Sequence, residues 1–166
     1  IQEDRSAPVA SVQAWCRSGS MHEGDWLGAG MAHFVEHMLF KGTGKRDANE
    51  IAGMVQAAGG YINAYTSFDR TVYWIDTPSD GVGTCLEVLA DAICDSQLPE
   101  GEFAKEQEVI RREFVMGDDN PAQVLGKQML ETAFRVHPCR HPVIGHLDIF
   151  NRLTRDDLHE FYQREY

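Results

Sequence analysis

The sequence predicts an α+β fold, in which helices pack on a mixed, largely antiparallel sheet. Residues 8–18 show the period-two alternation of a strand, and two further short segments are typical of strands and close enough in sequence to form a hairpin. The second half of the chain shows helical periodicity instead. Because strands and helices do not alternate regularly, a doubly wound parallel sheet is disfavoured.

The first expected element is a strand over residues 8–18, where apolar and polar residues alternate and β-branched and aromatic residues are frequent. A glycine-rich loop over 19–30 then leads into a helix that has no proline or glycine until Gly42. After a turn, Asp47 can cap a second helix, which two glycines end after residue 58.

A β-hairpin is expected next, with strands over 61–66 and 71–77 joined by a short turn. Pro78 ends the second strand, and either Ser79 or Asp80 can cap the helix that follows. That helix is expected to reach about residue 96, because its apolar residues recur at helical spacing.

Three further helices complete the predicted fold. Pro99 opens a long helix that reaches about residue 117, and Pro121 opens another that reaches about residue 136. A loop over residues 137–145 follows. Thr154 can cap the last helix, because Asp157 lies in its first turn and can complete a capping box.

The length and composition are those of one acidic globular domain, or of a piece of a larger one. The chain has 166 residues, of which 43% are hydrophobic, and a net charge of −11. This charge argues against a nucleic-acid partner and against an anionic membrane surface, and it is compatible with cationic peptides. No apolar run is long enough to predict a membrane span. Because the first residue is Ile1 rather than Met, the sequence assigns no compartment.

A short motif in the first predicted helix carries candidate chemistry. Residues 33–37 have the pattern H-x-x-E-H, which is typical of an inverted zinc-hydrolase site. His33 and His37 are four residues apart, so on a helix they share one face and can bind one metal ion. Glu36 lies beside the second histidine, where it can take a proton from a water activated by the metal. The alternative is a core helix with two hydrogen-bonded histidines.

A third metal ligand is expected on another element, because a hydrolytic zinc usually keeps three protein ligands and one open position. Glu106 and Glu113 are seven residues apart on the long helix that Pro99 opens, at the margin of its core-facing stripe. A charged group there is costly unless it is paired or binds a metal, and an ion pair with an arginine is the alternative for either glutamate. The core-facing stripe of this helix consists of Phe103, Ile110 and Phe114. The residues alone do not show whether Glu106 or Glu113 is the metal ligand.

Two other groups of residues are weaker candidates. His137, Cys139 and His141 superficially resemble a metal cluster, but an ordinary connecting loop is the favoured interpretation. The four cysteines have no C-x-x-C spacing and are expected to be buried thiols. A closed structural zinc site would need four ligands, usually including cysteine, and no cysteine lies near the histidine motif.

Five blocks of sequence resemble the N-terminal catalytic domain of the pitrilysin family of zinc metallopeptidases, which includes insulin-degrading enzyme and the β subunit of mitochondrial processing peptidase. The blocks lie in the family's order and cover nearly the whole chain. They are AGMAHFVEHMLFKGT, GGYINAYTSFDRTVYW, EQEVIRREFVMGDDNP, HPCRHPVIG and LTRDDLHEFYQREY.

The resemblance implies roles for individual residues. It implies that His33, His37 and Glu113 bind one zinc ion, because the family's third ligand ends an E-x6-E pair at a similar distance from the second histidine. Glu106 then becomes a supporting carboxylate of the catalytic site, and Glu36 the general base.

The resemblance also implies a substrate-binding edge strand, which corresponds to Asn63, Ala64, Tyr65 and Thr66. An unpaired strand edge offers N–H and C=O groups to an extended peptide. The expected function is therefore that of a zinc-dependent endopeptidase acting on extended peptides or unfolded proteins. The alternative is a non-catalytic relative that binds only zinc and peptide, which the complete set of ligands and base disfavours.

Finally, the resemblance implies that this chain is one part of a larger enzyme. Family members carry a second, similarly folded domain or subunit that closes over the substrate, and no segment here corresponds to it. The family's usual first strand and its later strands are also missing. We therefore expect residues 1–166 to be one catalytic domain, truncated at both ends, that binds zinc but cleaves peptides poorly by itself.

Overall fold

The computed structural model describes residue 2 and residues 5–166, so the N-terminal bound of the predicted domain lies outside the described residues. The fold is α+β, as the sequence predicts, with several helices packed on one small sheet. In chain order the strands and α-helices are β1 (Val9–Cys16), α1 (Met31–Met38), α2 (Ala48–Ala57), β2 (Tyr61–Thr66), β3 (Thr71–Pro78), α3 (Val82–Asp95), α4 (Glu100–Asp118), α5 (Pro121–Ala133), α6 (Leu147–Phe150) and α7 (Arg155–Glu165).

The three strands form one antiparallel sheet in the order β1–β3–β2. Gln13 of β1 and Asn63 of β2 face Trp74 of the central strand from opposite sides. The predicted hairpin of β2 and β3 is confirmed, and Ser67 N donates to Arg70 O at 2.8 Å across its turn. Because β3 is central, β2 pairs with a strand on one side only within the described part of the chain.

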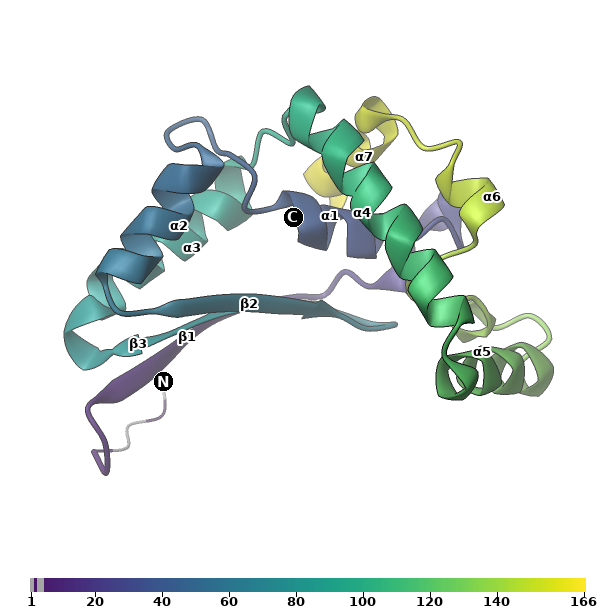
Figure 1. Ribbon diagram of the computed structural model, residues 1–166, viewed down its shortest axis with the longest axis horizontal. Coiled ribbons are helices and arrows are strands. Elements are labelled where there is room, and N and C mark those ends of the chain that lie inside the picture. Colours follow the sequence, from purple (N-terminus) through teal and green to yellow (C-terminus); the bar gives the residue numbers. More distant parts are fainter. Residues whose placement is uncertain (1, 3–4) are drawn as a thin grey trace.

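Helices cover one face of the sheet (Figure 1). α3 packs on β1 and β3, α2 packs on α3, and α1 packs against β2. α4 crosses α1, and α7 also packs against α1. α1 is therefore enclosed between the sheet and the C-terminal helices.

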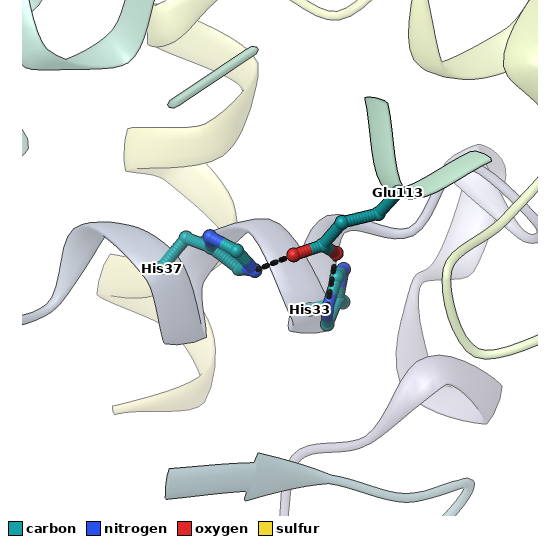
Figure 2. Close-up of side chains that lie close together, drawn as sticks. All are labelled: His33, His37 and Glu113. Atoms are coloured by element: carbon teal, nitrogen blue, oxygen red, sulfur yellow. Dashed lines mark ion pairs between the residues drawn. The ribbon is translucent and has the colours of Figure 1, made fainter. Parts of the chain in front are cut away.

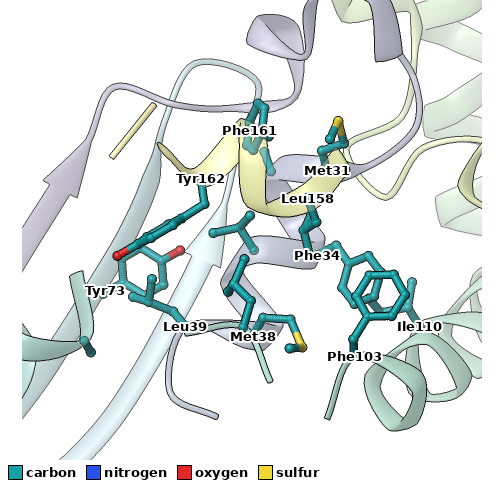
Figure 3. Close-up of a cluster of buried hydrophobic side chains, with 14 of the residues drawn as sticks. Met31, Phe34, Met38, Leu39, Tyr73, Phe103, Ile110, Leu158, Phe161 and Tyr162 are labelled. Atoms are coloured by element: carbon teal, nitrogen blue, oxygen red, sulfur yellow. The ribbon is translucent and has the colours of Figure 1, made fainter. Parts of the chain in front are cut away.

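The hydrophobic core is centred on α1 (Figure 3). Phe34 is fully buried, and its ring stacks on Phe103 of α4 with centroids 4.7 Å apart. On the sheet side, the buried Tyr73 lies with its hydroxyl oxygen 2.9 Å from that of Tyr166. Burial of one large apolar side chain contributes about 1.5–3 kcal/mol. These contacts hold the helix that carries the histidine motif on several sides.

Two predicted helix caps are confirmed. The Asp47 carboxylate accepts hydrogen bonds from Asn49 N at 2.8 Å and Glu50 N at 2.9 Å, and the Glu50 carboxylate accepts one from Asp47 N at 2.8 Å. At α7, Thr154 Oγ1 accepts from Asp157 N at 3.2 Å, and Asp157 accepts from Thr154 N at 2.9 Å. These side chains satisfy N–H groups that the first turn of a helix leaves unpaired.

Replacement of Asp47 by alanine is expected to lower the free energy of unfolding by about 1 kcal/mol, because α2 loses its N-terminal cap. Urea denaturation of the two proteins measures the difference. Asp80→Ala is the matched control, since Asp80 is exposed and caps no helix. An Asp47→Ala variant that is no less stable than the control would contradict the capping role.

The predicted cap of α3 is wrong. Ser79 and Asp80 lie in a short 3₁₀ turn, and α3 begins after Gly81 with no capping side chain. A Cβ atom at Gly81 would lie 2.3 Å from Thr77 Oγ1, which is much closer than atoms can approach. Close packing therefore requires glycine at the position where a capping side chain would stand.

The predicted end of α5 is also wrong, because the helix stops at Ala133 rather than near residue 136. Phe134 has extended backbone angles, φ −112° and ψ 124°, and its ring lies 5.2 Å from that of His137. α5 buries none of its residues, so no packing sustains a longer helix. The sequence pattern did not predict the short helix α6.

All four cysteines are free thiols. Cys85 is buried as expected, whereas Cys94 is exposed and the other two are half-buried, so the prediction of buried thiols holds for one cysteine. No helix in the described part of the chain is both long and apolar enough to cross a membrane.

Candidate metal centre

The helix that carries the histidine motif begins at a glycine that no other residue could replace. Gly30 has φ +78°, and a Cβ atom there would lie 2.1 Å from Ile144 O. Glycine cannot cap a helix with its side chain, so the N–H groups at the start of α1 need another acceptor. The neighbouring Glu23 supplies this acceptor.

Glu23 is almost completely buried, and its carboxylate binds the backbone that leads into α1. Its Oε2 accepts from the N–H groups of Gly28, Ala29 and Gly30 at 3.1 Å each, and its Oε1 accepts from Ala32 N at 3.2 Å. Burial raises the pKa of Glu23 to about 7, although these four hydrogen bonds oppose the shift. Glu23 was not among the predicted site residues; the available signal was an acidic residue shortly before a helix whose N-terminus has no capping side chain.

Three side chains from α1 and α4 converge on one point (Figure 2). His33 Nε2 lies 3.6 Å from Glu113 Oε2, and His37 Nε2 lies 3.7 Å from Glu113 Oε1. All three ligand atoms lie within 4.8 Å of one another. Within the described residues, this is the one group of three or more such side chains that could hold a metal ion.

The donor set fits zinc. The N···O separations are too long for hydrogen bonds, and they suit atoms that share one ion at about 2.0–2.2 Å from each. Burial, and next to it the neighbouring His37, lowers the pKa of His33 to about 3, so this imidazole is neutral at pH 7. Two imidazoles and one carboxylate are a common ligand set of hydrolytic zinc sites.

Glu106 lies beside His37 rather than among the three converging ligand atoms. Its Oε2 lies 3.1 Å from His37 Nδ1, and its Oε1 lies 2.6 Å from Lys41 Nζ. Burial raises the pKa of Glu106, but the bonds from Lys41 and His37 outweigh it and hold the pKa below its ordinary value. The ion-pair alternative considered for this glutamate therefore involves a lysine, not an arginine.

Glu36 lies beside the three converging side chains and contacts the sheet. Its Oε2 accepts a hydrogen bond from Thr66 Oγ1 of β2 at 2.5 Å. Burial raises the pKa of Glu36, whereas the bond from Thr66 lowers it. The bond joins the motif helix to the edge strand, a contact between residues 30 apart that no local pattern reveals.

A cavity of about 500 Å³ opens beside these groups. His33, Glu36 and Glu113 line it together with Ala64, Tyr65 and Thr66 of the edge strand. Asn63, the fourth residue of the predicted substrate strand, borders a smaller hollow next to Glu36 and His37. The cavity also reaches Gln123 of α5 and Val143 and Ile144 of the loop before α6, which the sequence analysis did not single out.

The loop of His137, Cys139 and His141 does not gather into a metal cluster. His137 Nδ1 accepts from Cys139 N at 3.2 Å, which forms a local turn. His141 Nδ1 lies 3.0 Å from His146 Nε2. The loop interpretation is consistent with these contacts.

The fold and this cluster define an α+β domain with a candidate metal centre, and the comparisons name its family. Residues 1–146 match the insulinase family, peptidase family M16. An uncharacterised zinc protease of Mycobacterium leprae is 36% identical over 157 residues, covering 95% of this chain and 35% of the relative. A probable mitochondrial-processing peptidase subunit beta of Arabidopsis thaliana is 33% identical, covering 99% of this chain and 31% of the relative. The chain belongs to the insulinase (M16) peptidase family.

Solved structures show the same fold. A protease from Helicobacter pylori superposes with a TM-score of 0.91 at 32% identity, covering 96% of this chain and 39% of that protein. An inactive M16 peptidase domain from Pseudomonas fluorescens superposes with a TM-score of 0.87 at 20% identity, which shows the fold alone. The chain thus spans about a third of the length of the curated relatives described above.

Proposed function

We propose that this chain is the zinc-binding catalytic domain of an endopeptidase that hydrolyses peptide bonds in extended peptides. The observation that carries the proposal is the convergence of His33, His37 and Glu113 in a cavity that Glu36 and an edge strand also line. The family match and the relatives named as zinc proteases support it.

His33 Nε2, His37 Nε2 and one carboxylate oxygen of Glu113 would hold the zinc ion. When bound, zinc lowers the pKa of water and polarises the scissile carbonyl. Three protein ligands leave one position open for the reaction, whereas a purely structural site is usually closed by four.

Glu36 is the proton carrier in this proposal. Its carboxylate lines the cavity and is not one of the three converging ligands, so it is free to accept a proton from the attacking water. It then donates that proton to the leaving amine nitrogen. The hydroxyl of Thr66 holds Oε2 in place for both transfers.

The edge of β2 is the proposed substrate cradle. Among the described residues β2 pairs with β3 alone, and residues 64–66 border the cavity. An extended peptide could add to this edge through main-chain hydrogen bonds, which would place a peptide carbonyl beside the metal centre. Binding through the main chain tolerates many substrate sequences.

We further propose that a second domain or subunit of similar fold completes the enzyme. The relatives are about three times as long as the matched region, and one of them is named as a subunit of a processing peptidase. The candidate cavity is open, so a second body could close over a bound peptide. This chain alone would then bind zinc and cleave peptides slowly.

Elemental mass spectrometry of the purified chain, together with cleavage of a quenched fluorescent peptide, tests the proposal. We expect one zinc per chain and slow cleavage that chelation abolishes. Zinc without any cleavage, even with excess protein and long incubation, would favour a non-catalytic zinc- and peptide-binding relative. A chain that binds no added zinc would overturn the ligand assignment.

Removal of the support behind His37 is expected to weaken zinc binding by about 10–100-fold, the range seen when partners of metal ligands are lost. Lys41→Met and Glu106→Gln should both show this loss in a competition titration with a chromophoric chelator. Lys105→Met is the matched control, because Lys105 is exposed and, among the described residues, pairs only with Glu102 on the surface of α4. If both variants bound zinc as tightly as the control, Glu106 and Lys41 would not be needed to support His37 as a ligand.

A further inference from the structure

A second pocket opens directly beside the metal-centre cavity, and we call it the side pocket. Its volume is about 270 Å³, and it shares Gln123, Val143 and Ile144 with the larger cavity. Phe68 of the hairpin turn and Leu130 of α5 add further apolar wall. Because three residues line both spaces, the side pocket is the neighbouring space that a side chain of a peptide bound in the cavity could enter.

One charged side chain in this wall has no partner among the residues that the structure describes. The backbone N–H of Arg140 donates to His137 O at 3.0 Å, but its side chain makes no hydrogen bond or ion pair with any described residue, and its Nε is buried without an acceptor. The other cation of the wall, Lys127, is already paired with Asp118 at 3.0 Å. A partly buried cation without a partner is costly, so the guanidinium of Arg140 favours a ligand that brings an acceptor.

We propose that the side pocket binds a glutamate side chain of the peptide substrate, a specificity that rests on the proposed peptidase function. The two methylene groups of glutamate suit the apolar wall, and its carboxylate can accept the paired N–H groups of a guanidinium. A lysine side chain in the pocket would be repelled by the positive charges of Arg140 and Lys127. A purely apolar side chain would leave the Arg140 guanidinium unpaired.

This preference is local and differs from the long-range field of the molecule. The net charge of −11 attracts cationic peptides from a distance, whereas Arg140 acts only on the residue that enters the side pocket. The preferred substrate therefore has a glutamate at one position and need not be acidic at the others.

Peptide binding to the zinc-loaded Glu36→Gln variant tests the proposal without interference from cleavage. A labelled host peptide is scanned with glutamate and with glutamine at each position in turn, and fluorescence anisotropy gives the dissociation constants. At one position we expect glutamate to bind about tenfold more tightly than glutamine, because a charge-assisted hydrogen bond replaces a neutral one.

Two variants of Arg140, each made in the same Glu36→Gln background, assign that preference to the side pocket. Arg140→Gln should bring the ratio of the glutamate and glutamine peptides to about one, and Arg140→Glu should favour a lysine peptide at the same position. Arg135→Gln is the matched control, since Arg135 is an exposed arginine a few residues earlier. It should leave the ratio unchanged.

Two results would overturn the glutamate specificity while leaving the peptidase proposal intact. One is tight peptide binding with no position that distinguishes glutamate from glutamine. The other is a preference that survives Arg140→Gln. Failure of every host peptide to bind would overturn the glutamate specificity and the proposed substrate class together.

Discussion

Replacement of Glu36 by glutamine is expected to slow peptide hydrolysis by about 10²–10⁴-fold while zinc stays bound. The amide cannot accept a proton from water, so the reaction loses its general base. The amide oxygen can still accept the hydrogen bond from Thr66 Oγ1, so the contact between α1 and β2 is kept. The change therefore removes the proton acceptor and keeps both the zinc ligands and the contact between α1 and β2.

Single-turnover cleavage with protein in excess over peptide gives the rate even if turnover is slow, and elemental analysis gives the zinc content of the same sample. Glu108→Gln is the control, because Glu108 lies exposed on α4 and its one ion pair within the described part of the chain is with Arg111. Undiminished cleavage by a zinc-loaded Glu36→Gln protein would assign the proton transfer to another group.

Replacement of Glu113 by alanine is expected to weaken zinc binding by more than about 100-fold, which exceeds the loss expected for supporting partners. Glu113 is the one ligand that comes from outside α1, and both histidine Nε2 atoms face its carboxylate. Without it, two imidazoles remain on one helix, which is fewer than the three protein ligands of a catalytic zinc site. Peptide cleavage should disappear with the metal.

The fold should survive the Glu113→Ala change, because the side chain is about a third exposed and alanine is a good helix former. Urea denaturation of the metal-free proteins checks this, and Glu108→Ala on the same helix is the control. If Glu113→Ala bound zinc as tightly as the control, the third ligand would have to be another residue.

Patterns that span a few residues were predictable from the sequence. The caps at Asp47 and Thr154 follow from contacts within one helical turn, and the spacing of His33 and His37 follows from the helical repeat. The hairpin follows from two short strand-like segments that a short turn joins. In each case the backbone geometry of a single element or turn determines the result.

Contacts between distant residues were decided by packing. Glu113 lies 76 residues after His37, and the residues alone did not distinguish it from Glu106. The family resemblance favoured Glu113. The crossing of α4 over α1 brings its carboxylate to both histidines. The same crossing places Glu106 behind His37.

The sequence by itself determined the α+β class, the order of the strands and longer helices, and the H-x-x-E-H motif, because these depend on local periodicity and turn residues. Only the tertiary structure decided that Glu23 holds the start of α1, that Thr66 holds Glu36, and that the Arg140 guanidinium lies in the side pocket without a partner among the described residues. These features join segments that meet only when the core around α1 is packed, so no local pattern specifies them.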